Sequence, residues 1–240
     1  MGGPLSAAAL IVAAGTGSRI GGEPKQFRRL GEAPVLAWSG HTLRRHPAVS
    51  ELVIVVPASV AEIPPPWLAA LADRLIAGGE TRRESVALGL SAISGKSEAV
   101  LVHDGARPFV TAALIDRVLE ASSQGPAIPG LRVTDTVKMI DAGSRVLATL
   151  DRERLRAAQT PQAFPVGLLR DLHARAAREA AGGTDDAALA ERYGVPVKVV
   201  DGDPLNLKIT TQTDFALAEW LVAAGQTHLA GIEPPTAGDD

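Results

Sequence analysis

Residues 7–19 read AAALIVAAGTGSR, an apolar run that stops at Gly15 and continues into a glycine-rich turn. Two further apolar runs follow, LVIVV at residues 52–56 and AVLV at residues 99–102. Short continuous apolar runs of this kind are typical of strands that are buried on both faces of a parallel sheet. The three runs therefore predict the centre of a parallel sheet.

Helical patterns lie between and after these strands. We expect helices at residues 35–45, 67–75, 82–93, 111–122, 166–181, 185–193 and 213–223, and a further strand at 195–201. Thr81 and Glu84, at the entrance of the third helix, have the spacing of a capping box. Strands that alternate with helices predict an α/β fold, with a mostly parallel, twisted sheet and helices on both of its faces.

Two segments interrupt this alternation. Residues 57–66 are rich in proline and predict a surface loop. Residues 131–150 hold short β-prone pieces around the turn-like DAG at 141–143, which predicts a hairpin arm that extends to about residue 152. An isolated two-stranded ribbon is marginal in water, so we expect the arm to pack on a second copy of the chain.

The composition is typical of one globular domain, which we expect to span residues 1–224. Of the 240 residues, 46% are hydrophobic and 21% are charged, which suits a sizeable core beneath a charged surface. From residue 225 onward the chain turns to Gly, Pro, Thr and Asp. We expect residues 225–240 to form a disordered tail.

Charge and cysteine content exclude several classes of function. A formal net charge of −3 provides no general attraction to nucleic acid or to an anionic membrane. The chain has no cysteine, which excludes disulfides, thiolate metal sites and a cysteine nucleophile. We find no secretory signal and no stretch near the roughly 20 apolar residues of a membrane span. We therefore expect a cytoplasmic protein with no nucleic-acid or membrane partner.

The turn after the first strand is a candidate phosphate site, because glycines let backbone N–H groups approach a phosphate. A Walker A loop would need Gly-Lys followed by Ser or Thr, and a dinucleotide fingerprint would need a third glycine where Ile20 stands. Neither motif fits, and on the glycines alone a plain strand-to-helix turn remains an alternative. The candidate phosphate-facing residues are Ala13, Ala14, Gly15, Thr16 and Gly17.

Two cations accompany this turn. Arg19 and Lys25 stand six residues apart around Gly21 and Gly22. That spacing suits a mobile loop which carries two positive charges toward a triphosphate. Solvated surface charges are the alternative.

A second glycine pair precedes the helix at residue 82, in the segment GGETRRES. Two arginines in the first turn of a helix oppose its dipole, at a cost of a few tenths of a kcal/mol unless an anion compensates. An anionic ligand near this turn is therefore a hypothesis, with simple solvation as the alternative. The candidate residues are Gly78, Gly79, Glu80, Arg82 and Ser85.

Charged residues also follow the strand at 99–102. Asp104 and Arg107 come just past its carboxyl end, where open α/β sheets place their ligands. Asp104 could orient a substrate hydroxyl or help to hold a metal ion, whereas we expect His103 to pack within the strand. Weaker single signals are Arg152, Thr160, Lys208 and Thr184, the last of which most simply belongs to a helix cap.

Taken in order, nine segments resemble the 2-C-methyl-D-erythritol 4-phosphate cytidylyltransferases, the IspD family of the non-mevalonate isoprenoid pathway. They are AAGTGSRI, PKQF, GGETRRESV, VHDGARP, TDTVK, DRERL, TPQAF, TDDAA and NLKIT, and they cover roughly residues 8–222. No single segment is specific, but nine at compatible spacing make chance a poor explanation. Two departures are small: Gly105 stands where alanine is frequent, and the Thr-Asp-Asp at 184–186 varies a common Thr-Asp-Glu.

The resemblance implies a Rossmann-like nucleotidyltransferase fold with a protruding β-arm, in a homodimer whose arms embrace. It also implies a reaction that joins CTP to 2-C-methyl-D-erythritol 4-phosphate and releases pyrophosphate. Mg²⁺ or another divalent cation is expected, held largely by the CTP phosphates.

Site residues are implied by the same resemblance. Arg19 and Lys25 match the family's transition-state cations. Arg152 and Lys208 match the cations that position the substrate phosphate, with Arg152 acting on the partner chain's site. Gly78, Gly79, Glu80 and Ser85 fall where the family recognises cytosine and ribose. Asp104, Arg107 and Thr136 fall where it meets the substrate or the nucleotide phosphates; Thr160 and Thr184 are further substrate-binding candidates, and Asp104 is the candidate metal ligand.

Other functions remain open. A ribitol 5-phosphate cytidylyltransferase would share the fold and most of these motifs, and a non-catalytic nucleotide-binding domain would bind the ligand without turnover. An NAD-dependent oxidoreductase is disfavoured, because the third glycine is missing and the second strand ends in Val-Val-Pro rather than in an acidic residue. Some members of the family are fused to a following cyclodiphosphate synthase. This chain ends without one, so we expect a single activity.

Overall fold

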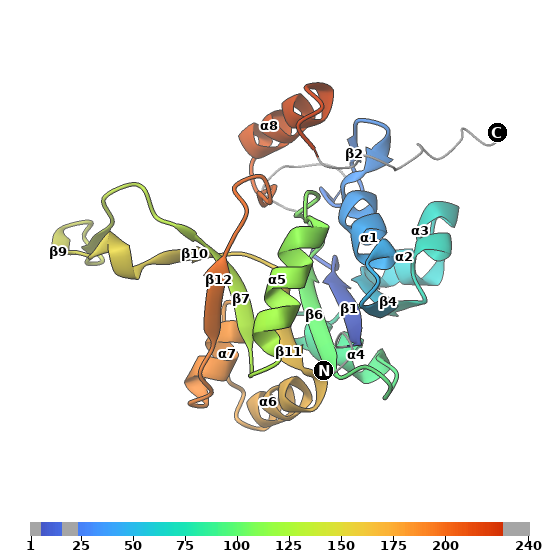
Figure 1. The fold of residues 1–240 in the computed structure, drawn as a ribbon, viewed down its shortest axis with the longest axis horizontal. Coiled ribbons are helices and arrows are strands. Elements are labelled where there is room, and N and C mark those ends of the chain that lie inside the picture. The colour runs from blue at the N-terminus through green and yellow to red at the C-terminus, as the bar shows by residue number, and fades with distance from the viewer. Residues whose placement is uncertain (1–5, 16–23, 228–240) are drawn as a thin grey trace.

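An eight-stranded sheet runs through the middle of the molecule (Figure 1). The computed structural model describes residues 6–15 and 24–227. The central strand β1 (Ala7–Val12) pairs in parallel with β4 (Val49–Val56) on one side and with β6 (Ala99–Asp104) on the other. The three apolar runs of the sequence therefore form the centre of a parallel sheet, as predicted.

The strands beyond this centre make the sheet mixed. Its order is β10-β7-β11-β6-β1-β4-β5, and β12 pairs with β7. β5 and β12 run parallel to their neighbours, whereas β10 and β11 run antiparallel to theirs. The bounds are β5 (Arg74–Ala77), β7 (Ala127–Arg132), β10 (Arg156–Ala158), β11 (Gln162–Pro165) and β12 (Lys198–Asp201), and a separate short ribbon joins β2 (Arg29–Leu30) to β3 (Ala33–Pro34).

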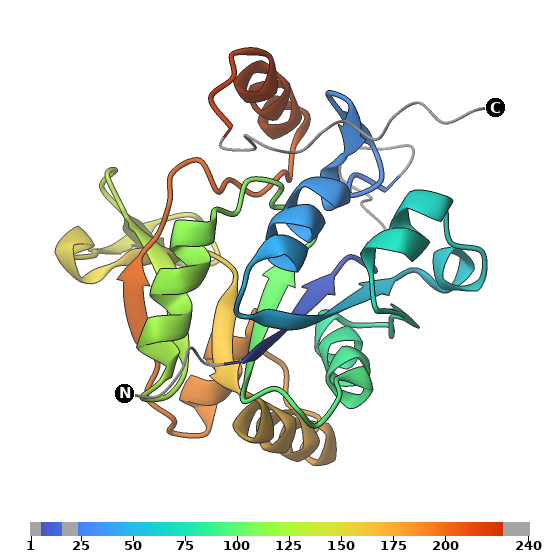
Figure 2. The ribbon, with the colours of Figure 1, turned by 45° about the vertical axis from the view of Figure 1, so that its right-hand side comes forward.

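Helices cover both faces of the sheet, as Figure 2 shows. Alternate residues of β1 face opposite layers, so that Ala9 and Ile11 belong to one core cluster and Ala8 and Leu10 to the other. The first layer holds α1 (Val35–Arg45), α3 (Pro66–Leu71) and α5 (Ala112–Ser122). The second layer holds α4 (Arg82–Ala92), α6 (Val166–Arg178) and α7 (Asp186–Arg192).

The last helix, α8 (Gln212–Ala223), closes a third, smaller cluster. Its Phe215 packs with Leu30, Phe109 and Ile209, which ties the chain after β12 to the segments that precede α1 and α5. Residues 228–240, which hold most of the predicted tail, lie outside the described part of the chain. In the part that is described, no helix is long and apolar enough to cross a membrane.

Two expectations about local structure were wrong. Residues 67–75 do not form one helix, because α3 ends at Leu71 and the chain enters strand β5 at Arg74. Asp73 explains the break: its N–H donates to the Leu52 carbonyl and its carboxylate accepts from the Leu52 N–H, which fixes the chain to β4. The proline-rich segment 57–66 is also more than a loop, since it contains the short helix α2 (Ala58–Glu62).

The predicted hairpin arm is present. β8 (Lys138–Ile140) and β9 (Val146–Thr149) pair antiparallel, and the hairpin extends away from the sheet (Figure 1). Asp141 closes its turn, because its carboxylate accepts hydrogen bonds from the N–H groups of Gly143 and Arg145, both at 2.9 Å. The short helix η1 (Arg152–Arg154) follows the hairpin and leads back to the sheet.

Candidate active site

A cleft of about 480 Å³ opens at the carboxyl ends of the parallel strands. The register of the sheet places it there: Val12 of β1 lies between Val55 of β4 and Asp104 of β6, so the segments that follow these strands meet. The cleft collects predicted site residues from five separate segments. They are Ala13, Ala14, Gly15, Lys25, Gly79, Glu80, Arg82, Ser85, Asp104 and Lys208.

The glycine-rich turn is held by Gln26, which is not among the predicted site residues. Gln26 is buried, and its side-chain amide donates to the carbonyl oxygens of Ala13 and Gly15, both at 2.7 Å. Because Lys25 immediately precedes Gln26 in the chain, the same anchor sets the backbone position of Lys25 beside the turn. The only signal in the sequence was the place of Gln26 within the segment PKQF.

The second glycine pair lies against the first turn. A Cβ atom on Gly78 would come within 2.3 Å of the Ala14 Cβ and within 2.9 Å of the Ser85 Oγ, so only glycine lets the two loops approach this closely. Ser85 is buried, and its hydroxyl accepts a hydrogen bond from the Gly79 N–H. The capping box predicted for Thr81 and Glu84 is present at the start of α4.

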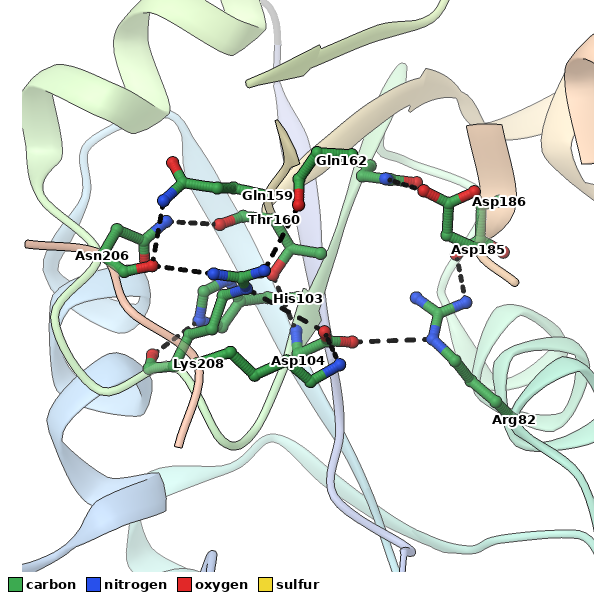
Figure 3. Close-up of polar contacts among 12 residues, drawn as sticks. Arg82, His103, Asp104, Gln159, Thr160, Gln162, Asp185, Asp186, Asn206 and Lys208 are labelled. Atoms are coloured by element: carbon green, nitrogen blue, oxygen red, sulfur yellow. Dashed lines mark hydrogen bonds and ion pairs between the residues drawn. The ribbon is translucent and has the colours of Figure 1, made fainter. Parts of the chain in front are cut away.

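Asp104 is the centre of charge in the cleft (Figure 3). Its Oδ2 accepts a hydrogen bond from the Lys208 Nζ at 2.7 Å, and its Oδ1 lies 3.5 Å from the Arg82 Nε. Burial alone would raise the pKa of this carboxyl. The charges of Lys208 and Arg82 outweigh burial and lower the pKa from 3.8 to about 2, so Asp104 is ionised at neutral pH.

Arg82, at the start of α4, has anionic partners within the chain. The Arg82 Nη1 donates to the Asp186 Oδ2 at 2.8 Å, and the Nε faces Asp104, so these carboxylates offset part of the unfavourable interaction with the helix dipole. Burial lowers the pKa of this guanidinium, but the two carboxylates outweigh burial and raise it. Arg82 lines the cleft, and its charge is shared between the partly buried Asp104 and the buried Asp186.

A hydrogen-bond chain behind the cleft fixes Asp104 from the backbone side. The Asp104 N–H donates to the Thr160 Oγ1 at 3.0 Å, and that hydroxyl lies 3.1 Å from the His103 Nδ1. The other ring nitrogen of His103 donates to the Arg107 carbonyl, so the hydroxyl donates to Nδ1. Burial lowers the pKa of His103 to about 4, so His103 is a neutral, packed strand residue, as expected.

Arg107 holds the loop that carries Lys208. Only 8% of Arg107 is exposed, and its Nη1 donates to the Asn206 carbonyl at 2.8 Å. Asn206 is fully buried, and its amide donates to the Thr160 carbonyl at 2.7 Å. These bonds place Lys208 opposite Asp104, a contribution of Asn206 that the sequence alone did not reveal.

Comparison with known proteins identifies the family. The model of the family described as "IspD: 2-C-methyl-D-erythritol 4-phosphate cytidylyltransferase" matches residues 7–224 of this chain. The chain belongs to the IspD family. This confirms the resemblance drawn from the nine sequence segments.

Two IspD relatives show the range of chain organisation. The 2-C-methyl-D-erythritol 4-phosphate cytidylyltransferase of Syntrophus aciditrophicus is 39% identical over 218 residues, which cover 88% of this chain and 93% of the relative. A bifunctional enzyme IspD/IspF of Nitrobacter winogradskyi is 45% identical over 222 residues, which cover 90% of this chain and 56% of that enzyme. The chain thus spans about half the length of this bifunctional relative.

Solved IspD structures share the fold. The structure of 2-C-methyl-D-erythritol 4-phosphate cytidylyltransferase from Thermus thermophilus has a TM-score of 0.76 at 36% sequence identity. The match covers 89% of this chain and 98% of the Thermus chain. The structure of 4-diphosphocytidyl-2C-methyl-D-erythritol synthase from Anaerococcus prevotii has a TM-score of 0.81 at 31% sequence identity. The match covers 92% of this chain and 100% of the Anaerococcus chain. The predicted α/β fold, with a mostly parallel sheet flanked by helices, is therefore confirmed.

Several predicted IspD site residues lie away from the cleft of their own chain. Arg152 and Thr136 are exposed on the arm, where the Arg152 Nη1 donates to the Thr134 carbonyl at 2.7 Å. Thr184 is exposed before α7, whose cap is Asp185 rather than Thr184. Arg19, Thr16 and Gly17 lie outside the described residues.

Proposed function

We propose that this cleft transfers the CMP moiety of CTP to 2-C-methyl-D-erythritol 4-phosphate, giving 4-diphosphocytidyl-2-C-methyl-D-erythritol and pyrophosphate. The observation that carries the proposal is the composition of the cleft: a glycine-rich turn, Lys25 and the Asp104–Lys208 pair face one space in a chain of the IspD family. Both substrates are charged metabolites of the cell interior, so we place the reaction in the cytoplasm.

The chemistry needs no general base. A phosphate monoester has a second pKa near 6, so at pH 7 the alcohol phosphate is mostly dianionic and is itself the nucleophile. One of its oxygens attacks the α-phosphorus of CTP in line, and the bond from that phosphorus to the β-phosphate oxygen breaks. Pyrophosphate leaves with that electron pair, and no proton has to move in the step.

The work of the protein is to bring two polyanions together. We propose that Lys25 and Arg19 stabilise the charge that develops around the α-phosphorus, while Lys208 holds the phosphate of the alcohol substrate. Lys208 is well placed for this, because its ammonium lies on Asp104 at the wall of the cleft and its side chain is 41% exposed. A base is not part of this arrangement, which agrees with the neutral, fully buried His103.

A divalent cation such as Mg²⁺ would supply further neutralisation of the triphosphate when bound. In the parts of the chain that the structure describes, no three His, Asp or Glu side chains are grouped to hold a metal ion. Asp104 offers a single carboxylate, and its Oδ2 already accepts from Lys208. We therefore propose that the cation is held mainly by the CTP phosphates, with Asp104 as one additional ligand at most.

We also propose a homodimer in which the arm of one chain completes the cleft of the other. Support comes from the exposed position of Arg152 and Thr136 on the arm and from the apolar side chains that the hairpin exposes to solvent. Burying such a surface against a second copy is favourable. Arg152 of one chain would then contact the alcohol phosphate bound by its partner.

A substrate comparison tests the proposed reaction. Purified protein is given CTP and Mg²⁺ with either 2-C-methyl-D-erythritol 4-phosphate or ribitol 5-phosphate, and pyrophosphate release is followed. We expect turnover with the methylerythritol substrate and a much lower kcat/KM with the ribitol substrate. The reverse preference would assign the chain to ribitol phosphate, and binding of CTP without turnover would indicate a regulatory domain.

A further inference from the structure

A single guanidinium joins the cleft to a buried acid behind it. Arg82 bridges two carboxylates from different elements, with its Nη1 on Asp186 of α7 at 2.8 Å and its Nε 3.5 Å from Asp104 of β6. Figure 3 shows the side chains in one row, from Asp186 through Arg82 and Asp104 to Lys208. Negative and positive charges alternate along it.

Asp186 is a buried carboxylate that hydrogen bonds hold in place. It is 1% exposed, and its second oxygen lies 2.9 Å from the Nε2 of the buried His173 on α6. Burial would raise the pKa of this carboxyl, but the hydrogen bond with His173 and the charge of Arg82 outweigh burial and lower it. Its neighbourhood is rigid as well, because Gln162 of β11 donates to Asp185 and accepts from the Ala187 N–H.

Without Asp186, Arg82 would keep one of its two ion pairs, the one with Asp104. The same Asp104 carboxylate already binds Lys208 at 2.7 Å and lies 4.0 Å from the Arg107 Nε. A guanidinium released from Asp186 would move toward Asp104 and compete with the Lys208 ammonium for it. The Arg82 Nη2 is buried without a hydrogen-bond partner among the described residues, so Arg82 has little else to hold it in place.

We propose that Asp186 is a positioning residue, which divides the charge of Arg82 between two carboxylates and so keeps Asp104 available to orient Lys208. The inference rests on the proposed function, in which Lys208 holds the phosphate of the alcohol substrate. Asp186 is the first residue of a short helix and does not line the cleft, so its effect on the reaction is indirect.

The test is a double-mutant cycle of Asp186→Asn and Arg82→Gln. Asp186→Asn keeps the shape of the side chain and removes its charge. We expect it to raise the KM for the alcohol phosphate about tenfold while the KM for CTP changes less than about threefold. In the Arg82→Gln background, Asp186→Asn should add no more than about twofold, because its effect passes through Arg82.

Glu51→Gln is the matched control. Glu51 is 8% exposed and pairs with an arginine, Arg74, at 3.5 Å, but it lies in the amino-terminal half of β4, away from the cleft. It should lower the melting temperature and leave both KM values unchanged. If Asp186→Asn does the same, or if its effect is fully additive with Arg82→Gln, the proposal is overturned.

Two further measurements distinguish a wrong proposal from a variant that does not fold and from a wrong proposed function. If Asp186→Asn does not fold, Arg82→Lys replaces it, since an ammonium keeps the charge but cannot span both carboxylates. The same rise in the KM for the alcohol phosphate is then expected, and an unchanged KM overturns the proposal. Absence of turnover by the wild-type chain would instead contradict the proposed function.

Discussion

Asp104 is the residue on which the charges of the cleft converge. It lies at the end of the strand beside β1, its backbone N–H is held by Thr160, and its carboxylate is held by Lys208 and Arg82. A carboxyl in such a place stays ionised over the whole physiological range of pH. Its charge therefore orients cations and does not act as a proton carrier.

The low pKa of Asp104 predicts an acid-dependent loss of stability. Because its pKa falls from 3.8 to about 2 on folding, its ion pairs stabilise the native state above about pH 4 and are lost as the pH falls toward 2. The contribution is on the order of 2 kcal/mol. Urea unfolding at pH 6 and pH 3 should show that Asp104→Asn weakens the dependence of the unfolding free energy on pH. An undiminished dependence would show that Asp104 is not its source.

Lys25 is expected to act in the transition state. Lys25→Ala should lower kcat on the order of 10²-fold or more, because it removes a preorganised cation from the α-phosphorus. Steady-state kinetics with both substrates measures this. Lys96→Ala, which removes an exposed lysine outside the cleft, is the control and should leave kcat unchanged. A normal kcat in Lys25→Ala would remove this residue from the proposed role.

At the residue scale, the sequence indicated the cleft but not its supports. Asp104 and Lys25 could be selected because they follow strand ends and a glycine-rich turn. Gln26, Asn206 and Asp186 could not, because their partners lie 13, 46 and 104 positions away in the chain. The ion pair between Arg82 and Asp186 could not be predicted either, since nothing local in the sequence pointed to Asp186.

Within one chain, the arm leaves several large apolar side chains exposed to solvent. Met139, Ile140, Val146 and Leu147 are all exposed on a two-stranded ribbon, with Leu147 60% exposed. A two-stranded ribbon has only marginal stability on its own, so we expect a second chain to pack against these side chains. The arm is therefore the element on which the proposed dimer depends.

Leu147→Asp is expected to weaken that dimer. A carboxylate in an apolar interface loses its hydration, so the dimer should dissociate at concentrations where the wild-type chain stays paired. Sedimentation velocity measures the shift. Ile63→Asp, at an apolar residue that is 80% exposed on the main body, is the matched control and should sediment like the wild type. If both variants sediment alike, the arm is not the interface.

Elements with a strong local pattern could be predicted, and those that depend on distant pairing could not. Helix α1 begins and ends where the sequence placed it, because its apolar face is continuous. Strands β10 and β11 have three and four residues, and they exist because they pair with β7 and β6. The first two residues of β5 were expected to lie in a helix, because the strand character of β5 comes from its position beside β4.

At the scale of the whole molecule, we propose that each site is shared by two chains. Lys25 lines the cleft of its own chain, whereas Arg152 lies on the arm. Mixed dimers of inactive Lys25→Ala and Arg152→Ala chains should therefore recover part of the activity, since one of their two sites would be intact. Pyrophosphate release after co-refolding measures this. No recovery despite proven heterodimers would mean that each chain uses its own Arg152.

Oxygen labelling follows the proposed bond formation atom by atom. The alcohol phosphate is labelled with ¹⁸O at its three non-ester oxygens and incubated with CTP and the wild-type chain, and the products are observed by ³¹P NMR. If the substrate phosphate attacks the α-phosphorus, the CMP phosphorus of the product carries one ¹⁸O in the bridging position and the pyrophosphate carries none. Label in the pyrophosphate, or none beside the CMP phosphorus, would contradict the proposed transfer.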